Sequence, residues 1–339
     1  MKVLVRVDAY EEIALGHLSR CIELGKALMQ LQNEVVFLSY EDKSSKSRLE
    51  DSGIDFEVVS FKINDDQFVD KEMKILESFS TSIDILIVDS YNVNKKYFDE
   101  INRLFPKIVY LDDLESDYDN VDMVINPSCT VTQNSYISKN VLCGMEFIIL
   151  GKDYQNREKK VIYPKTRSIL VTMGGIDHFN LSSIILPILE KIDKEIEVNI
   201  VIGPYYENIK QIKNSAKNSN LSINFFEGLP NISSVMLRSD IAISAGGFTL
   251  YELSAMSIPT IGIALWDNQK TNVECLSKKD AIIPLYYHSD ERFKDELSVQ
   301  LQKLISNREL REKMSIASGK AVDGNGVDKI AKEINRLYG

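Results

Sequence analysis

The stretch Val3-Leu-Val-Arg-Val-Asp-Ala-Tyr-Glu-Glu-Ile-Ala-Leu-Gly-His-Leu-Ser-Arg-Cys21 sets a pattern that the rest of the chain repeats. Residues 2–7 form an apolar run broken by Arg6, which predicts a buried β-strand, and helical spacing of apolar residues begins at Leu18. His17 therefore stands where a strand has ended and a helix begins. In open α/β sheets that edge binds ligands, and an imidazole there is a candidate general base. The alternative is a helix residue facing solvent, and position alone does not decide between the two.

Strands and helices alternate along the whole chain, apart from a polar segment near its middle. This alternation predicts right-handed βαβ units, parallel sheets and hence an α/β fold. A chain of 339 residues exceeds what one hydrophobic core usually serves, which favours two domains. We expect a Rossmann-like domain over residues 1–150, a linker over 151–166 and a second Rossmann-like domain over 167–339, facing the first across a cleft. The closing helix, residues 326–338, is a candidate for packing back on the first domain.

The individual elements follow from periodicity and from the turn residues between them. The expected strands are residues 3–7, 34–39, 56–60, 83–89, 107–111, 124–127, 168–172, 197–202, 222–226, 241–244, 260–264 and 281–284. The expected helices are residues 18–31, 43–51, 66–79, 95–104, 180–192, 207–216, 232–238, 249–256, 269–277, 290–306, 308–317 and 326–338.

Composition excludes several classes of protein. The net charge of −10 argues against nonspecific binding to nucleic acid, because phosphates require a basic surface. The four cysteines form no C-x-x-C pair, and no histidine has ligand partners nearby, so we expect neither a metal nor a redox cofactor. No apolar stretch is long enough to span a bilayer, and the first strand leaves no room for a signal segment. We therefore expect a cytoplasmic protein without membrane insertion.

Two glycine pairs follow strands in the second half of the chain. They are Gly174-Gly175 and Gly246-Gly247, within Thr172-Met-Gly-Gly-Ile-Asp177 and Ser244-Ala-Gly-Gly-Phe-Thr-Leu-Tyr-Glu252. Glycine lets main-chain N–H groups approach an anion, and a following helix favours phosphate there. In the second pair, Thr249 can cap the helix or contact phosphate, and Glu252 can turn toward a ligand hydroxyl pair. The alternative is two tight turns eased by glycine, but a double occurrence favours a phosphate site. A dinucleotide fingerprint is absent from the first half, where Gly16 stands alone.

Three further groups are candidates, two at strand ends and one in a polar loop. Asn268 and Gln269 follow the strand at 260–264, as ligand contacts or as helix caps. Asp89 and Tyr91 follow the strand at 83–89, where a buried Asp is often structural and a Tyr often lines a pocket. The Asp-Tyr-Asp run at 117–119 matches a metal-binding spelling of some glycosyltransferases, but such runs are common in a chain with 50 acidic residues.

These motifs together resemble the UDP-2,4-diacetamido-2,4,6-trideoxy-β-L-altropyranose hydrolases of pseudaminic acid biosynthesis, a family also described as SpsG-like glycosyltransferases. The resemblance spans nearly the whole chain in the family's order. It rests on Arg6, Asp8, Gly16, His17 and Arg20, on Asp89 and Tyr91, on Asp112 and Asp113, on Gly174, Gly175 and Asp177, on Ser244 to Glu252, on Asn268 and Gln269, and on Asp323 to Gly326. The sequence departs from the family pattern at Tyr10 to Glu12, Leu15, Ile125 to Ser128 and Ile176, which flank the expected sugar pocket.

The resemblance implies a GT-B fold and a reaction. UDP would bind the second domain, with its diphosphate over Gly246-Gly247 and its ribose on Glu252. His17 would activate water against the anomeric carbon of the sugar, and UDP would leave without help from a metal. Asp8 and Tyr91 are candidates for orienting the His17 ring. The other expected substrate-binding residues are Arg6, Gly16, Gly174, Gly175, Asp177, Thr249, Asn268 and Gln269.

We therefore predict a monomeric hydrolase that converts a UDP-linked 2,4-diacetamido-2,4,6-trideoxyhexose to UDP and free sugar. A GT-B glycosyltransferase or a hydrolysing 2-epimerase acting on a related nucleotide sugar is the first alternative, since it would share the fold and the UDP site. A nucleotide-sugar-binding protein without catalysis is the second.

Overall fold

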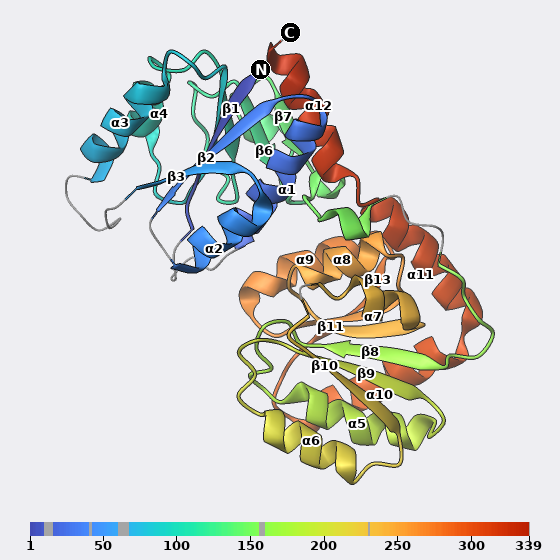
Figure 1. Ribbon diagram of the computed structural model, residues 1–339. Helices are drawn as coiled ribbons and strands as arrows, with labels where there is room; N and C mark the ends of the chain where they lie inside the picture. Colours follow the sequence, from blue (N-terminus) through green and yellow to red (C-terminus); the bar gives the residue numbers. More distant parts are fainter. Residues whose placement is uncertain (10–15, 41–42, 60–67, 156–159, 230, 339) are drawn as a thin grey trace. The chain divides into compact units, whose positions relative to one another are not determined.

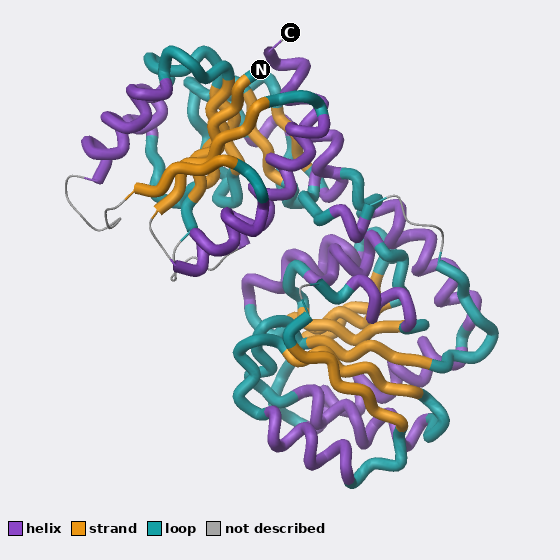
Figure 2. Tube along the Cα trace, in the orientation of Figure 1, coloured by secondary structure: helices purple, strands orange, loops and turns teal. Residues whose placement is uncertain are grey.

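The computed structural model describes every residue except 10–15, 41–42, 60–67, 156–159, 230 and 339. The chain divides into two compact units, one formed by residues 1–152 with 325–339 and the other by residues 153–324. Figure 1 labels their helices and strands, and Figure 2 separates helices, strands and loops by colour. Across the described residues, no helix is both long enough and apolar enough to cross a membrane.

The first unit is built around a parallel sheet. Over the described residues, its strands lie in the order β3-β2-β1-β4-β5-β6-β7. The chain runs outward from β1 to β3 and then returns to β4 on the other side of β1, so the winding direction changes between β1 and β4. The strands are β1 (Lys2–Val7), β2 (Glu34–Tyr40), β3 (Asp55–Val59), β4 (Ile85–Asp89), β5 (Ile108–Leu111), β6 (Met123–Asn126) and β7 (Val141–Cys143). The helices are α1 (Gly16–Gln30), α2 (Lys43–Ser52), α3 (Phe68–Phe79), α4 (Lys95–Ile101) and α12 (Gly326–Tyr338), with short 3-10 turns η2 (Gln133–Ser135) and η3 (Met145–Phe147).

Each face of this sheet carries its own apolar core, and the alternation along β1 shows which residues face which core. Val3, Val5 and Val7 pack with residues of α1 and α12, and those two helices contact each other (Figure 1). Leu4 points to the opposite face and packs with residues of α3 and α4. Successive side chains of a strand point to opposite faces, so this assignment extends to the polar residues at the strand ends.

The second unit repeats the arrangement. Its strand order over the described residues is β10-β9-β8-β11-β12-β13, all parallel, and the winding direction changes between β8 and β11. The strands are β8 (Ser168–Thr172), β9 (Glu197–Ile202), β10 (Ser222–Glu227), β11 (Ile241–Ala245), β12 (Thr260–Ala264) and β13 (Ile282–Tyr286). The helices are α5 (Leu181–Ile192), α6 (Ile209–Lys217), α7 (Ser233–Arg238), α8 (Thr249–Ala255), α9 (Asp267–Ser277), α10 (Glu291–Ser306) and α11 (Arg308–Ala321); the short turn η4 (Lys152–Tyr154) crosses the boundary between the units.

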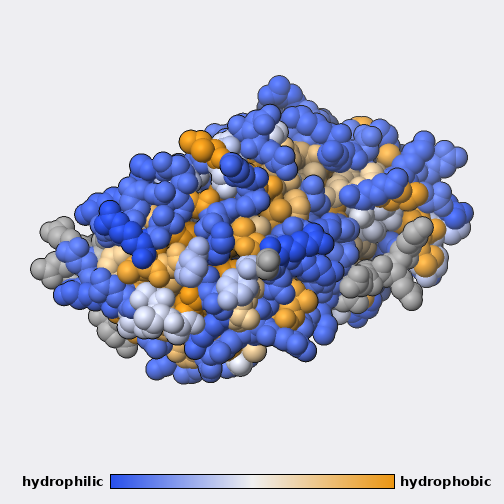
Figure 3. Space-filling view, turned by 90° about the horizontal axis from the view of Figure 1, so that it is seen from above, coloured by the Kyte–Doolittle hydropathy of each residue, from blue (hydrophilic) through white to orange (hydrophobic). Residues whose placement is uncertain are grey.

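The predicted α/β architecture with two parallel sheets is confirmed. Strand β7 was not predicted, because its three residues are too few to show a periodic pattern. Helix α4 ends at Ile101, three residues before its predicted end. The face drawn in Figure 3 is mostly hydrophilic, with hydrophobic residues visible among the hydrophilic ones.

A buried arginine anchors the segment that leads into β8. Arg311 in α11 is 1% exposed. It donates to the main-chain carbonyls of Leu304 (2.9 Å), Ile305 (2.5 Å), Tyr163 (2.9 Å) and Pro164 (3.0 Å). These bonds join the end of α10 to residues 163–164, so the guanidinium fixes how the chain enters the second sheet.

Replacing Arg311 by methionine is expected to lower the free energy of unfolding by about 3 kcal/mol, because buried carbonyls would lose a charged donor. Urea denaturation followed by far-UV circular dichroism measures this loss. Arg308→Met is the matched control on the same helix, since the Arg308 side chain is 52% exposed. Equal losses in the two variants would contradict the anchoring role.

Candidate functional site

His17 is the second residue of α1, at the edge where the first unit changes its winding direction. The residue is 7% exposed, so the alternative of a solvent-facing helix residue is wrong. Its ring nitrogen Nδ1 lies 2.6 Å from Oδ1 of Asp89, the last residue of β4. β1 and β4 are neighbours, and Val7 pairs with Asp89 in their register. The sheet topology therefore brings an imidazole and a carboxylate together at the place where such folds bind ligands.

The environment of Asp89 determines which nitrogen of His17 carries the proton. Arg20 donates to both carboxylate oxygens at 2.7 Å, and the Cys21 thiol donates to Oδ2 at 3.2 Å. Burial alone would raise the pKa of Asp89, but the charge of Arg20 and hydrogen bonds from Arg20 and His17 hold that pKa well below its ordinary value. An ionised carboxylate only accepts hydrogen bonds, so in the neutral imidazole we assign the proton to Nδ1, although Nη2 of Arg20 also lies 3.1 Å from that nitrogen. Nε2 of the neutral ring keeps a lone pair and can accept a proton from a bound molecule.

Arg20 connects the His17–Asp89 pair to a second carboxylate. Its Nη1 donates to Oδ1 of Asp113 at 2.9 Å, and its Nη2 lies 2.8 Å from Oδ2 of the same residue. The guanidinium fork thus offsets both negative charges, which allows Asp89 to stay ionised beside the imidazole. Arg20 was in the motif but not among the predicted site residues. Its spacing of three from His17, which puts both on one face of a helix, is the signal that was overlooked.

Tyr91 lies beside His17, as the sequence suggested. The two rings meet edge to face, with centroids 4.6 Å apart and an interplanar angle of 89°. The Tyr91 hydroxyl donates to Oδ2 of Asp113 at 3.1 Å, and the residue is 44% exposed. Burial and the Asp113 charge raise the pKa of Tyr91 to about 12, so its phenol stays protonated near neutral pH. Tyr91 therefore supplies a fixed aromatic wall to His17 and a neutral hydroxyl at the rim.

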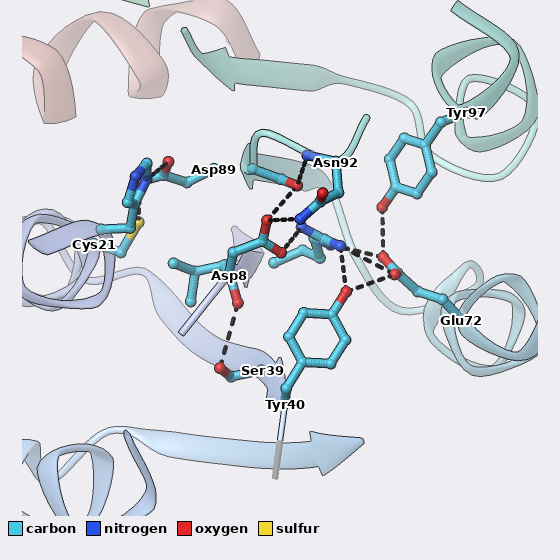
Figure 4. Close-up of polar contacts among 12 residues, drawn as sticks. Asp8, Cys21, Ser39, Tyr40, Glu72, Asp89, Asn92 and Tyr97 are labelled. Atoms are coloured by element: carbon cyan, nitrogen blue, oxygen red, sulfur yellow. Dashed lines mark hydrogen bonds and ion pairs between the residues drawn. The ribbon is translucent and has the colours of Figure 1, made fainter. Parts of the chain in front are cut away.

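The structure corrects the position predicted for Asp8. Asp8 was a candidate for orienting His17, but its carboxylate binds Arg6 and the Ser90–Asn92 turn, and Asp89 orients the ring instead. In Figure 4, Asp89 and Cys21 lie on one side of Asp8, and Glu72 and Tyr97 lie on the other. The reason is strand alternation: Val7 faces α1, so Asp8 continues the face of Arg6.

Arg6 was predicted to bind substrate, and the structure corrects this as well. The residue is 1% exposed and enclosed within the first unit. Its Nε donates to Oε1 of Glu72 at 2.7 Å, and its Nη1 donates to Oδ1 of Asp8 at 2.6 Å. A guanidinium held by two buried carboxylates has an internal partner for its charge.

Gly16 begins α1, and a Cβ added there would meet no described atom within 4 Å.

In the second unit, the loop after β8 holds the first glycine pair. Gly174 has φ +75°, a left-handed conformation that favours glycine. The carbonyl of Gly175 accepts from the main-chain N–H of Tyr205 at 3.0 Å, which ties this loop to the one after β9. Asp177 was predicted to contact substrate, but its carboxylate accepts from the N–H groups of Leu181 (2.7 Å) and Ser182 (2.9 Å). It therefore caps the start of α5.

The second glycine pair follows β11, and its two members differ. The N–H of Gly246 donates to the carbonyl of Ile263 at 2.7 Å and lies 3.2 Å from Oε1 of Gln269. A Cβ added to Gly246 would come within 2.9 Å of Val273, so glycine here allows α9 to pack closely. Gly246 therefore has an internal role in place of the predicted phosphate contact. A Cβ on Gly247 would meet no described atom within 4 Å, so that position is open.

Gln269 also has an internal role: its Oε1 accepts from the N–H of Leu265 at 3.0 Å as well as from Gly246. These bonds tie the end of β12 to the turn after β11, and the predicted ligand contact of Gln269 stays a prediction. Asn268, one residue earlier, is exposed. Trp266 beside it is 49% exposed, and its ring lies 5.0 Å from that of Phe179. An aromatic surface therefore stands at this end of the sheet.

Glu252 lies one turn into α8 and is partly buried. It accepts hydrogen bonds from the side chains of Tyr154 and Thr249, and burial raises the pKa of its carboxyl above the ordinary value. A carboxylate with a raised pKa and partners that hold its orientation is typical of a binding position.

The Asp-Tyr-Asp run of the first unit has contacts within the protein. Asp117 accepts from the N–H of Ile137 at 2.5 Å, and Asp119 pairs with Lys95.

Comparison with known proteins identifies the fold. Residues 168–334 match the glycosyltransferase family 28 C-terminal domain. The crystal structure of MurG from Acinetobacter baumannii superposes with a TM-score of 0.75 at 13% identity, covering 99% of this chain and 100% of that one. The fold is GT-B. The predicted GT-B class is thus confirmed.

Two of three relatives of this GT-B chain are named for polysaccharide biosynthesis or for enzymes that act on sugars. The spore coat polysaccharide biosynthesis protein SpsG of Bacillus subtilis is 23% identical over 350 residues, covering 100% of this chain and 99% of that protein. The Helicobacter pylori pseudaminic acid cytidylyltransferase and UDP-2,4-diacetamido-2,4,6-trideoxy-beta-L-altropyranose hydrolase is 24% identical over 280 residues, covering 79% of this chain and 45% of that protein. An uncharacterized protein of Methanocaldococcus jannaschii is 24% identical over 283 residues, covering 79% of this chain. This chain spans 56% of the archaeal protein, so it matches about half the length of two relatives.

Proposed function

We propose that this protein hydrolyses a UDP-linked 2,4-diacetamido-2,4,6-trideoxyhexose to UDP and the free sugar, as a step of pseudaminic-type nonulosonic acid biosynthesis. The observation that carries the proposal is the His17–Asp89 pair, with Nδ1 held 2.6 Å from an ionised carboxylate. A general base requires an imidazole whose other nitrogen is unprotonated. The GT-B fold and the relationship to a protein named for this hydrolase support the choice of substrate.

The proposed reaction is an attack of water on the anomeric carbon. Nε2 of His17 takes a proton from water as the water oxygen bonds to that carbon. The bond between the carbon and the phosphate oxygen breaks, and its electron pair leaves with UDP. His17 becomes positively charged, and the Asp89 carboxylate offsets that charge without taking the proton. Tyr91 limits the movement of the ring, which keeps Nε2 aimed at one position.

We further propose that the second unit binds UDP. Residues 168–334 match a glycosyltransferase C-terminal domain, which supports this assignment. The main-chain N–H groups near Gly247 and Gly174–Gly175 would face the diphosphate, since a glycine lets a phosphate approach the main chain. Glu252, held by Tyr154 and Thr249, would accept from the ribose hydroxyls. Fixed dipoles of this kind stabilise a leaving diphosphate.

The reaction is tested by following UDP and free sugar by NMR after the protein is incubated with the UDP-diacetamido-trideoxy-altrose without added metal. In H₂¹⁸O, attack at the anomeric carbon leaves the UDP unlabelled, whereas attack at phosphorus places ¹⁸O in its phosphate. Tight UDP binding without release of UDP would overturn the hydrolase assignment and favour a transferase. Label in the UDP would overturn the site of attack.

Replacing Glu252 by alanine is expected to weaken UDP binding by roughly tenfold or more, because a carboxylate that accepts from a ribose hydroxyl contributes about 1.5–3 kcal/mol. Isothermal titration calorimetry with UDP measures the change. The turnover rate at saturating substrate should fall less than the affinity, since the ribose is remote from the reacting bond. Glu195→Ala is the control, because that side chain is 79% exposed. An unchanged UDP affinity in Glu252→Ala would remove Glu252 from the ribose site.

A further inference from the structure

A single carboxylate oxygen holds both neighbours of Tyr91. Oδ2 of Asp8 accepts from the Ser90 hydroxyl at 2.6 Å and from Nδ2 of Asn92 at 3.0 Å. The Ser90 hydroxyl oxygen in turn accepts from the main-chain N–H of Asn92 at 2.9 Å. The three bonds link Asp8, Ser90 and Asn92 beneath the turn that carries Tyr91, and Figure 4 shows the bond between Asp8 and Asn92.

Asp8 is itself held in place by a buried cluster around Arg6. It is fully buried, and its Oδ1 accepts from Arg6 at 2.6 Å. Glu72 from α3 holds the other side of that guanidinium, and the hydroxyl of Tyr97 donates to Glu72 at 2.7 Å. The Tyr40 hydroxyl bonds to both Arg6 and Glu72 (Figure 4). Burial would raise the pKa of Glu72, but the Arg6 charge and these hydrogen bonds lower it, so Glu72 stays ionised beside Arg6. Buried polar groups that are all satisfied make a rigid support.

The support lies on the opposite face of the sheet from His17. Asp8 and Arg6 continue the β1 face of Leu4, whereas His17 and Asp89 belong to the α1 face. Among the described residues, the main-chain N–H of Asp8 donates to the carbonyl of Asp89 at 3.0 Å, and the Asp8 side chain holds the turn at Ser90–Asn92. That turn presents the Tyr91 ring to His17, with centroids 4.6 Å apart.

We infer that Asp8, through Ser90 and Asn92, is a positioning residue that sets the Tyr91 ring against His17 and so fixes the direction of the catalytic imidazole. The inference rests on the proposed function for its kinetic consequence. In this role Asp8 contacts neither substrate nor His17. A loosened turn would let the Tyr91 ring move, and the His17 ring would spend less time in the productive orientation.

A double-mutant cycle tests this inference. Ser90→Ala removes one bond of the turn without changing charge, and it is expected to lower kcat about tenfold while UDP affinity stays unchanged. In a Tyr91→Ala background the same Ser90→Ala change is expected to have almost no further effect, because the bonds of Ser90 act on His17 through Tyr91. Ser82→Ala is the matched control: that hydroxyl donates to the carbonyl of Phe79 at 3.1 Å, before the opposite end of β4. A full-sized effect of Ser90→Ala in both backgrounds would mean a merely structural role and overturn the inference.

Asn92→Ala gives a second route if Ser90→Ala does not fold, since Asn92 is exposed and its loss leaves the core intact. It should reproduce the loss of kcat and its dependence on Tyr91. A readout independent of turnover is the ring-proton NMR signal of His17, one of three histidines, identified from the His17→Ala spectrum. Ser90→Ala should shift that signal in the direction produced by Tyr91→Ala. If no UDP-sugar is hydrolysed but this shift occurs, the positioning role of Asp8 is supported and the proposed function is rejected. If hydrolysis occurs without the shift, the positioning role is rejected and the proposed function is retained.

Discussion

Replacing His17 by alanine is expected to lower the rate of UDP-sugar hydrolysis roughly 1,000-fold, while UDP binds with unchanged affinity. General base catalysis by a positioned imidazole contributes on the order of 10²–10⁴ to a rate. His17 belongs to the first unit, whereas the proposed UDP contacts, Glu252 among them, belong to the second. Single-turnover release of UDP and calorimetric titration with UDP measure the two quantities separately.

The outcome has a simple control. His288 pairs with Asp290 in the second unit, and its ring nitrogen Nδ1 lies 2.6 Å from that carboxylate, the same separation as in the His17–Asp89 pair. His288→Ala is therefore expected to leave the rate unchanged, because that pair lies on the surface of the second unit. A His17→Ala variant that kept the full rate would show that another group activates water. Loss of UDP affinity along with the rate would point to a binding role for His17.

The fold could be predicted from sequence because it depends on patterns that are local and repeated. Apolar runs of strand length alternate with helical spacing in both halves, and parallel βαβ units are the way that chains of this kind bury those surfaces. Strand β7 escaped detection because Val141–Cys143 is only three residues long. Its pairing with β6 is a tertiary effect that no window of sequence displays.

The site was predicted less completely, because the sequence placed residues at a sheet edge without saying which face they belong to. His17 and Tyr91 were expected together and lie together. Asp8, and not Asp89, was proposed as an orienting group for His17. Adjacent residues of a strand point to opposite faces of the sheet, so an error of one residue places a side chain on the wrong face. Val7 faces α1, so the next residue, Asp8, lies on the opposite face of the sheet from α1. Asp89 pairs with Val7 and therefore lies on the same face as α1 and His17. That assignment needed the strand pairing, which the sequence did not contain.

The glycine-rich turns illustrate a different limit. Glycine is required wherever a side chain has no room, whether a ligand or another part of the protein fills the space. At Gly246 the space is taken by Val273 and Gln269 of α9, whereas at Gly247 it is open. The sequence shows two identical residues side by side, and only packing separates the structural glycine from the one available to a phosphate.

Replacing Asp89 by asparagine is expected to lower the rate of hydrolysis by on the order of 10²–10⁴, nearly as much as losing His17 itself. An asparagine amide can donate to Nδ1, which would move the ring proton to Nε2 and leave no lone pair for water. The variant also loses the negative charge that offsets the imidazolium. Steady-state UDP release measures the rate. Asp113→Asn is the matched control: its carboxylate shares Arg20 with Asp89 but bonds to the Tyr91 hydroxyl where Asp89 bonds to His17, so a smaller loss is expected.

The same variant should change how stability depends on pH, and the sign follows from the lowered pKa of Asp89. Because the folded protein holds this group ionised more strongly than the unfolded chain does, the stabilisation is fully present above the ordinary aspartate pKa of about 4. It is lost as pH falls below that value toward the pKa in the folded state. The difference in free energy of unfolding between the protein and Asp89→Asn should therefore be largest near neutral pH and shrink in acid. A difference that does not change between neutral pH and pH 3 would mean that Arg20 does not hold an ionised Asp89, and the assignment of the proton to Nδ1 of His17 would fall with it.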